Sequence, residues 1–376
     1  MRITLTNKAF FPPFGGVETI VRSLASGLAS RDGLQVNVVV PNREGFRQRR
    51  SGDFEGAKVL ETATFATVAN TPIAPTLMWQ IRKSNPDLVH YHFPYPWVEA
   101  MEVLLGSGRP YIVSYHADIG RFKALFRMYQ PLMTRFLRNA KRIVVATHNH
   151  ISSSPFLSVL PPEIFEIIPF GLDLEPYRDS IQLRTKAAEF RGRLAENGPC
   201  ILFAGRLVAY KGIPTLLRAM QHIPGTLIMV GDGPLREELQ SLAQGLGVSN
   251  RIRWEGFVKA EDLPAYHHAA DIFVLPSDRP EEAFGLVQVE AHASGRPVVC
   301  CALPTGVTEV NLDGKTGLVV PLRDPMAMAE AINSLLSNPT LRSELGNNAR
   351  DRALREFTIG TMCDHYQNLY RKILDK

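Results

Sequence analysis

Two short segments of the chain combine residue types that bind phosphate and sugar hydroxyl groups. The first, Gly205-Arg-Leu-Val-Ala-Tyr-Lys-Gly212, carries an arginine and a lysine, and the second, Glu282-Ala-Phe-Gly-Leu-Val-Gln-Val-Glu290, brackets an apolar turn with two carboxylates. Cations and the N–H groups at a helix start bind phosphate oxygens, whereas carboxylates accept hydrogen bonds from hydroxyl groups. Together these groups predict a site for a ligand with a diphosphate and a sugar, as in a nucleotide sugar.

The two cations, Arg206 and Lys211, follow an apolar run at 200–204 that is typical of a buried strand. Arginine binds phosphate through two parallel hydrogen bonds, and lysine binds it as a point charge. A solvated loop is the alternative interpretation. Gly205 and Gly212 flank the pair and favour a close approach of the backbone to a ligand, so we expect both cations to contact phosphate.

The two glutamates, Glu282 and Glu290, lie before and inside an expected helix. Acidic residues near a helix start are common, so two surface carboxylates are the alternative interpretation. Their combination with the cationic segment favours a ligand site.

The first half of the chain has two candidate segments of its own. Gly15 and Gly16 open an expected helix whose apolar residues recur at helical spacing, so the helix start favours an anion there. His116 and Asp118 follow an expected strand, where ligand sites of α/β proteins occur. A simple turn at the glycines, and a capping Asp118 beside a hydrogen-bonded His116, are the structural alternatives.

Metal and dinucleotide sites are not expected. The pairs His90-x-His92 and His148-x-His150 each lack a nearby third ligand, and no Asp-x-Asp pair is present to hold Mg²⁺ on a diphosphate. The glycine fingerprint of dehydrogenases is also missing. The four cysteines have no metal-ligand spacing and are expected to be reduced core residues.

Composition predicts a cytoplasmic protein of two domains. The chain has 376 residues, and 45% of them are hydrophobic, which suits a core of ordinary size. No apolar run reaches the roughly 18 residues of a spanning helix. The first residues resemble a strand and not a signal peptide.

Positive charge is concentrated in the first half of the chain. Residues 1–170 contain 19 Lys and Arg against 12 Asp and Glu, and the segment 120–142 has seven cations, no anion and interleaved Phe122, Phe126 and Phe136. Docking on the anionic inner face of the cell membrane and a solvated basic helix face both remain open. Nucleic acid is not expected as a partner, because no nucleic-acid motif accompanies the charge.

Strand and helix patterns alternate through the chain and then start again. Continuously apolar strands separated by helices predict a parallel sheet with both faces covered. The fold class is therefore α/β, with two Rossmann-like doubly wound domains facing across a cleft. The expected parts are an N-terminal domain at 1–171, a linker at 172–198, a C-terminal domain at 199–360 and a closing helix at 361–376.

Taken together, these motifs resemble the retaining glycosyltransferases of family 4, which have the GT-B fold of two Rossmann-like domains. The resemblance rests on the motifs Glu282–Glu290 and Gly205–Gly212, the Gly15-Gly-Val-Glu loop, His116 at a strand end, and Val230-Gly-Asp-Gly-Pro. It covers nearly the whole chain. It implies an N-terminal domain that binds the acceptor, a C-terminal domain that binds the nucleotide sugar, and a closing helix that crosses back to the first domain.

The resemblance also implies roles for individual residues. Arg206 and Lys211 hold the donor diphosphate, Glu282 and His116 bind the transferred sugar, and Glu290 binds the ribose. The catalytic set is then His116, Arg206, Lys211 and Glu282. The donor-binding set is Gly15, Gly16, Val258, Phe284, Gly285, Leu286, Val287 and Glu290.

The implied reaction moves a hexose, with mannose as first choice, from a nucleotide sugar such as GDP-mannose to a saccharide acceptor. A lipid-linked acceptor in bacterial polysaccharide synthesis is expected, with no metal or other cofactor. The alternatives are a UDP-hexose donor, a nucleotide-sugar epimerase, and a non-catalytic nucleotide-sugar binding protein on the same fold.

Overall fold

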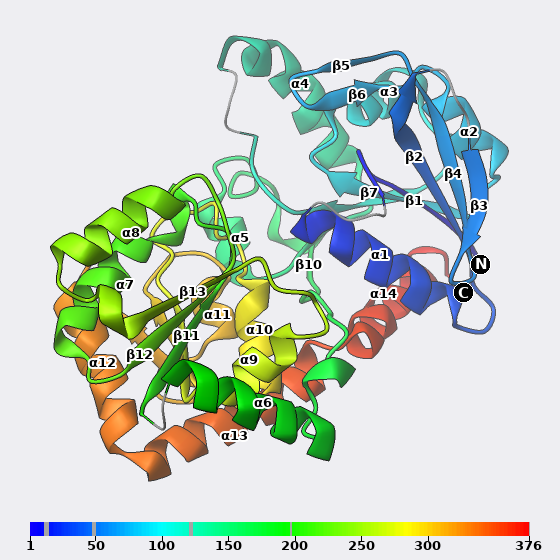
Figure 1. The fold of residues 1–376 in the computed structure, drawn as a ribbon. Coiled ribbons are helices and arrows are strands. Elements are labelled where there is room, and N and C mark those ends of the chain that lie inside the picture. Colours follow the sequence, from blue (N-terminus) through cyan, green and yellow to red (C-terminus); the bar gives the residue numbers. More distant parts are fainter. Residues whose placement is uncertain (11–14, 47–49, 120–122, 196–197, 376) are drawn as a thin grey trace. The chain divides into compact units, whose positions relative to one another are not determined.

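The chain folds as two compact units, each with its own sheet and core (Figure 1). The computed structural model describes residues 1–10, 15–46, 50–119, 123–195 and 198–375. Unit 1 comprises Met1–Leu172 and Ile359–Lys376, and unit 2 comprises Asp173–Thr358. The expected linker at 172–198 belongs largely to unit 2, because its helix α6 (Ile181–Ala195) packs on α9 (Leu263–Ala269).

Unit 1 is built on an eight-stranded sheet in the order β10-β9-β8-β7-β1-β2-β4-β3. Every pairing is parallel except that of β3 with β4 at one edge. A parallel sheet needs helices on its faces, and five helices of the first part of the chain accompany this one. The strands are β1 (Arg2–Thr6), β2 (Gln35–Phe46), β3 (Arg50–Phe54), β4 (Ala57–Thr64), β7 (Leu88–Phe93), β8 (Tyr111–Tyr115), β9 (Arg142–Val145) and β10 (Phe165–Ile167), and the helices are α1 (Gly16–Ala29), α2 (Leu77–Lys83), α3 (Pro96–Leu105), α4 (Lys123–Asn139) and α5 (His148–Ser153).

The last helix, α14 (Ile359–Ile373), packs on the first helix, α1, as expected for a closing helix (Figure 1). Gly27 permits this contact, because a Cβ atom there would lie 2.6 Å from the Cys363 sulfur. Two tyrosines of α14 extend their hydroxyl groups to the sheet. Tyr370 bonds His90 of β7 at 2.8 Å, and Tyr366 bonds Ser114 of β8 at 2.7 Å. The carboxyl end of the chain therefore completes the core of unit 1.

Unit 2 has a six-stranded parallel sheet in the order β13-β12-β11-β14-β15-β16. Strands β11 and β14 are buried at every position, as their continuous apolar sequences predict. The remaining elements cover and connect this sheet. The strands are β11 (Cys200–Ala204), β12 (Thr226–Val230), β13 (Ile252–Gly256), β14 (Ile272–Leu275), β15 (Val298–Cys301) and β16 (Gly317–Val320), and the further helices are α7 (Ile213–Ala219), α8 (Arg236–Gly245), α10 (Leu286–Ala293), α11 (Val307–Val310), α12 (Pro325–Ser337) and α13 (Pro339–Glu356).

The strand order identifies one preferred ligand position in unit 2. From β11 the chain proceeds outward to β12 and β13, and then returns to the other side of β11 to form β14. Ligands of open α/β sheets bind where the order reverses, beyond the carboxyl ends of the strands. The loops after β11 and β14 carry Lys211 and Glu282, so the topology brings these two residues to one place.

Some elements differ from the sequence expectation. Strand β10 begins at Phe165, two residues before the expected strand at 167–169, and β3, β4 and the small hairpin of β5 (Ala66–Val68) and β6 (Thr71–Ile73) were not predicted. Strand β3 lies at the sheet edge with β4 beside it, and β5 and β6 are only three residues long, so none of them needs the continuous apolar sequence of a central strand.

In the part of the chain that the structure describes, no helix is long and apolar enough to cross a membrane. The four cysteines are all free and buried, as expected for core residues.

Buried histidines make the stability of the fold sensitive to acid. His292 of α10 has no exposed surface, and burial lowers its pKa from 6.5 to about 3. The ring therefore stays neutral in the folded protein at pH 5, whereas in the unfolded chain it binds a proton below pH 6.5. The stability contribution is complete above pH 6.5 and is lost as the pH falls towards 3, by about 1.4 kcal/mol per pH unit.

We expect the variant His292→Gln to lose less stability than the parent protein between pH 6.5 and 5. Urea unfolding of unit 2 can be followed by Trp254 in a background with Trp79→Phe and Trp97→Phe, since the chain has only these three tryptophans. The exposed His222 gives the control His222→Gln. If the free energy of unfolding changes equally with pH in His292→Gln and in the parent, the buried neutral His292 ring is not a source of the acid sensitivity.

Candidate active site

Lys211 and Glu282 form a buried ion pair at the carboxyl edge of the unit 2 sheet. The Lys211 Nζ lies 2.6 Å from Glu282 Oε2, and the side chains are only 9% and 10% exposed. Ser277, in the loop after β14, donates a second hydrogen bond to the same Oε2 at 2.8 Å. Because both contacts use Oε2, the other carboxylate oxygen, Oε1, is left without a hydrogen bond to any described residue.

Close backbone packing holds the two loops together. Gly212 has φ +62°, and a Cβ atom there would lie 2.0 Å from the Pro276 carbonyl oxygen, so only glycine fits. On the other side, Thr305 after β15 donates a hydrogen bond to the Glu282 carbonyl at 2.8 Å. The loops after three neighbouring strands, β11, β14 and β15, therefore fix the ion pair.

Arg206 lies in the same loop as Lys211 but is fully accessible. Its side chain is exposed and forms no hydrogen bond or ion pair within the described chain. It follows Gly205, whose φ of +152° belongs to the region that favours glycine. An exposed guanidinium beside a buried lysine provides two cations at one sheet edge, one of them free to bind an anion.

The start of α10 provides backbone donors near the ion pair. Gly285 precedes the helix with φ +73°, and a Cβ atom there would lie 2.7 Å from the side-chain nitrogen Nε2 of Gln288. The N–H groups of a first helical turn have no acceptor inside the helix, so those of Leu286 and Val287 can bind an anion. The ring of Phe284 instead is buried against Phe357, so only its backbone is available to a ligand.

Glu290 lies on α10 beyond this helix start and is half-buried. Its Oε2 lies 3.8 Å from His267 Nε2, and its carboxylate is close enough to Tyr177 to act on the phenol. Burial, together with the Glu290 charge, raises the pKa of Tyr177, which keeps the phenol protonated as a donor. Glu282 and Glu290 therefore have separate partners, although they belong to one sequence motif.

Val258 follows β13 and packs partly into the core of unit 2. The preceding Phe257 is 87% exposed, which is unusual for a large aromatic side chain. A flat apolar ring beyond the carboxyl ends of the strands can stack on a planar group. Nothing in the sequence distinguishes Phe257 from a core residue.

In unit 1, His116 lies directly after β8 and is buried, with a neutral ring. Burial, and then the neighbouring His92, lower its pKa well below 6.5. His116 Nε2 lies 2.9 Å from His92 Nδ1, and its face stacks on Phe170 with 5.5 Å between ring centres. The other ring nitrogen, Nδ1, has no partner in the described chain. His116 therefore has one nitrogen fixed by His92 and one buried nitrogen without a hydrogen-bond partner among the described residues.

Asp118 has a structural role. One of its carboxylate oxygens, Oδ1, accepts hydrogen bonds from Tyr115 and Ser154, each at 2.6 Å. These contacts are consistent with the structural alternative for Asp118, and the ligand role of His116 stays a prediction.

The glycine pair of unit 1 opens α1 as predicted. Gly15 is the residue before the helix, Gly16 is its first residue, and both are exposed. The Glu18 carboxylate is buried in the first turn, and a Cβ atom at Gly15 would lie 2.9 Å from its Oε2. This carboxylate already complements the positive helix start, so the exposed backbone at Gly15 and Gly16 is what a ligand can reach.

The basic segment at 120–142 forms helix α4 from Lys123 onward; Arg121 and Phe122 lie outside the described residues. Phe136 is completely buried in the core of unit 1, so it does not belong to a membrane-facing surface as its position between cations suggested. The helical period explains this, since Met133 and Leu137 share its buried face. Arg135 and Arg138 are exposed, and the neighbouring Met128 is 80% exposed.

No group of three or more His, Cys, Asp or Glu side chains within the described ranges could hold a metal ion. His90 and His92 do stack on one face of β7, with ring centres 4.4 Å apart, but each bonds a neighbouring side chain. Sequence reasoning missed several supports of the site. Ser277 lies only five residues before Glu282, whereas Thr305 and Tyr177 are distant from the motifs along the chain, and His92 was considered only as part of a metal pair.

Two family descriptions match the chain, one on each half. Residues 14–176 match the family described as Glycosyltransferase Family 4, and residues 185–352 match the family described as Glycosyl transferases group 1. Among curated relatives, the O-antigen chain mannosyltransferase C of Escherichia coli is 30% identical over 100% of this chain and 99% of its own length. The D-rhamnosyltransferase WbpZ of Pseudomonas aeruginosa is 36% identical, over 77% of this chain and 75% of its own.

Solved glycosyltransferases share the fold. The Anabaena protein Alr3699/HepE, crystallised with UDP, superposes with a TM-score of 0.78 at 21% identity, over 99% of this chain and 100% of its own. WaaG, described as a glycosyltransferase involved in lipopolysaccharide biosynthesis, superposes with a TM-score of 0.68 at 20% identity, over 98% of this chain and 99% of its own. The motifs, the two Rossmann-like units and the full-length relatives agree: the chain belongs to the glycosyltransferases of family 4, with the GT-B fold.

Proposed function

We propose that this protein transfers mannose or a related hexose from a nucleotide sugar, GDP-linked as first choice, to a saccharide acceptor in bacterial polysaccharide synthesis. The observation that carries the proposal is the buried Lys211–Glu282 pair with the free Glu282 Oε1. Support for the sugar comes from relatives named as an O-antigen mannosyltransferase, a rhamnosyltransferase and a GDP-mannose-dependent mannosyltransferase.

The cations act on the leaving group. Breaking the bond between sugar C1 and the phosphate oxygen leaves an oxocarbenium-like sugar and a nucleoside diphosphate. Arg206, Lys211 and the first-turn N–H groups of α10 stabilise the negative charge that develops on this diphosphate. Positive charge of this kind replaces a divalent metal, so the proposed reaction has no metal cofactor.

Glu282 serves as a ligand for the sugar. Its Oε2 is occupied by Lys211 and Ser277, and its Oε1 can accept a hydrogen bond from a sugar hydroxyl. A carboxylate neutralised by a lysine is a poor nucleophile, so a covalent glycosyl-enzyme on Glu282 is not part of the proposal.

The proposed transfer retains the configuration at C1. The acceptor hydroxyl oxygen forms the new bond to C1 on the face that the diphosphate leaves. The proton of that hydroxyl passes to the departing phosphate oxygen, so no protein base is consumed. His116 remains neutral throughout and uses Nδ1 to bind the sugar, with Nε2 held by His92.

The acceptor is proposed to be lipid-linked, at the inner face of the cell membrane. The exposed Arg135, Arg138 and Met128 of α4 support this part of the proposal, because cations and an apolar side chain suit an anionic lipid surface.

Substitution of Arg206 tests the phosphate-binding role without disturbing the fold. Because the side chain is exposed and unpaired within the described residues, we expect Arg206→Ala to keep the melting temperature and to lower kcat about 10²- to 10³-fold. Lys211→Met and Glu282→Gln should lower kcat at least as much, but they also break a buried pair and should unfold more easily.

The measurement is transfer from GDP-mannose to a lipid-linked saccharide in the presence of a chelator. The exposed Arg218 on α7 provides the matched control Arg218→Ala. Near-normal turnover of Arg206→Ala, or complete loss of parental activity with the chelator, would be incompatible with the proposed chemistry. Conversion of the donor without any acceptor would identify an epimerase instead.

Thermal unfolding with GDP, UDP and ADP tests the donor class. A nucleotide that binds only the folded protein raises its stability by about 2.7 kcal/mol at a hundredfold excess over Kd. We expect the largest rise with GDP and a smaller rise for Arg206→Ala. A larger rise with UDP would select the UDP-hexose alternative, which the UDP complex of a similarly folded protein keeps open.

Co-sedimentation with vesicles tests the membrane contact. We expect Arg135→Gln combined with Arg138→Gln to weaken binding to vesicles that contain phosphatidylglycerol, by roughly 1 kcal/mol per cation. The control is Lys58→Gln combined with Lys83→Gln, which removes two exposed cations of the same unit outside α4. Unchanged binding of the α4 variant would leave α4 as a solvated basic helix.

A further inference from the structure

A second cationic pocket lies in unit 2 at the sheet edge opposite to Lys211 and Glu282. Arg296 lies two residues before β15, and Asp271 lies directly before β14, so the pocket adjoins the amino ends of the strands. The ion pair of the proposed donor site instead follows the carboxyl ends of β11 and β14. The cavity has a volume of about 410 Å³, which suits a small ligand.

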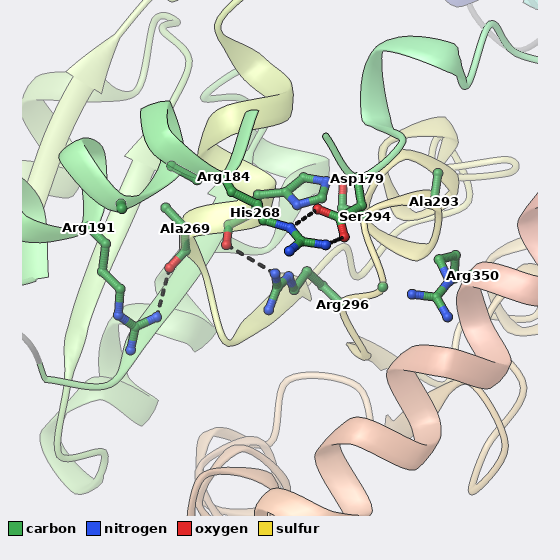
Figure 2. A pocket seen from close by; sticks show the side chains of 12 residues that line it. Asp179, Arg184, Arg191, His268, Ala269, Ala293, Ser294, Arg296 and Arg350 are labelled. Carbon is green, nitrogen blue, oxygen red and sulfur yellow. Dashed lines mark hydrogen bonds and ion pairs between the residues drawn. The ribbon is translucent and has the colours of Figure 1, made fainter. Parts of the chain in front are cut away.

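Four arginines from three parts of the fold line this basic pocket, and Figure 2 shows them around it. Arg184 and Arg191 come from α6, Arg296 from the turn after α10, and Arg350 from α13. The floor between them consists of small residues that leave the space open. These are Ala187, Ala188, Ala269, Ala293, Ser294 and Gly295.

Carboxylates compensate only part of this charge. Asp179, the one acidic residue of the lining, pairs with Arg184, and Asp271 pairs with Arg191 at 2.8 Å. Arg350 has the exposed Asp351 at 3.8 Å. The carboxyl end of α10 adds partial negative charge. Four guanidinium groups still outnumber the carboxylates that line the cavity.

Arg296 is the least satisfied of the four arginines. Its Nη2 donates to the His268 carbonyl at 3.1 Å, but its buried Nε has no hydrogen-bond partner in the described chain. Burial lowers its pKa, the Asp271 charge opposes this in part, and the neighbouring Arg191 and Arg342 lower the pKa further. His268 adds no further positive charge, because burial lowers its pKa and keeps its ring neutral.

Several like charges around an open cavity repel one another, and an anion in the cavity removes that repulsion. Arginine is suited to phosphate in particular, since its planar fork donates two parallel hydrogen bonds to two oxygens. Arg184 and Arg191 already have carboxylate partners, so Arg296 and Arg350 keep the donors that a ligand can use without breaking an ion pair at close range.

We propose that the basic pocket binds a phosphate-bearing anion at a position separate from the nucleotide-sugar site. The proposal goes beyond the transfer reaction and does not depend on it. A phosphorylated metabolite and the phosphate headgroup of a lipid share this chemistry.

Titration with pyrophosphate at constant ionic strength tests the proposal. We expect the parent protein to bind pyrophosphate at two sites, because the diphosphate part of a donor also binds near Arg206. Arg296→Gln combined with Arg350→Gln should weaken the second site about ten- to a hundredfold and leave the first. Arg206→Ala should show the converse pattern, so the two sites can be separated.

Two further variants keep the outcome decisive. If Arg296→Gln reduces folding, the double variant Arg350→Gln with Arg184→Gln is used instead, because both of these arginines are more exposed than Arg296. The matched control is Arg218→Gln with Arg253→Gln, which lies away from the pocket. The proposal is overturned if the parent binds one pyrophosphate that Arg206→Ala abolishes, or if the pocket variants bind like the parent.

Vesicles that contain phosphatidic acid distinguish the two sources of phosphate. Binding of pyrophosphate alone identifies a soluble ligand, and additional loss of vesicle binding in the pocket variants identifies a lipid headgroup. If neither probe responds to the pocket substitutions, the site does not bind phosphate.

Discussion

The buried ion pair of Lys211 and Glu282 is the constraint around which unit 2 is arranged. Two charges with about a tenth of their surface exposed are costly to bury, and they persist only where geometry and further hydrogen bonds compensate. Ser277 supplies one such bond, and the close approach of Gly212 to Pro276 fixes the distance between the two loops. The same arrangement leaves one carboxylate oxygen and several lysine N–H donors for a ligand. The pair is therefore the preorganised part of the proposed donor site.

Unit 1 also buries titratable side chains, but these side chains are neutral. Histidines at the ends of β7 and β8 are buried, and their low pKa values keep them uncharged. His90 is held by Tyr370 and Ser114, and His92 holds His116. The supports of this network come partly from α14, the last helix of the chain. A change in α14 can thus reach His116 through side chains in direct contact.

In unit 2, the carboxyl ends and the amino ends of the sheet strands carry cations of different kinds. At the carboxyl edge, a paired lysine and a free arginine accompany the start of α10. At the amino edge, four arginines surround an open cavity at the end of the same helix. The first arrangement combines cations with a helix start, which favours an anion. In the second arrangement, the carboxyl end of α10 carries partial negative charge, which disfavours an anion. The excess of guanidinium groups outweighs this charge.

The sequence by itself determined the fold class, the family and the motif residues, because these depend on local patterns. Apolar runs marked the strands, and Gly205–Gly212 and Glu282–Glu290 marked the chemistry. The edge strand β3 and its neighbour β4 lack that pattern and were missed. Only the tertiary structure decided which side chains meet. It paired Glu282 with Lys211 but Glu290 with Tyr177 and His267, and it placed Phe136 in the core. It also gathered four arginines from separate segments. Such contacts depend on strand order and helix packing, which bring together residues that are distant along the chain.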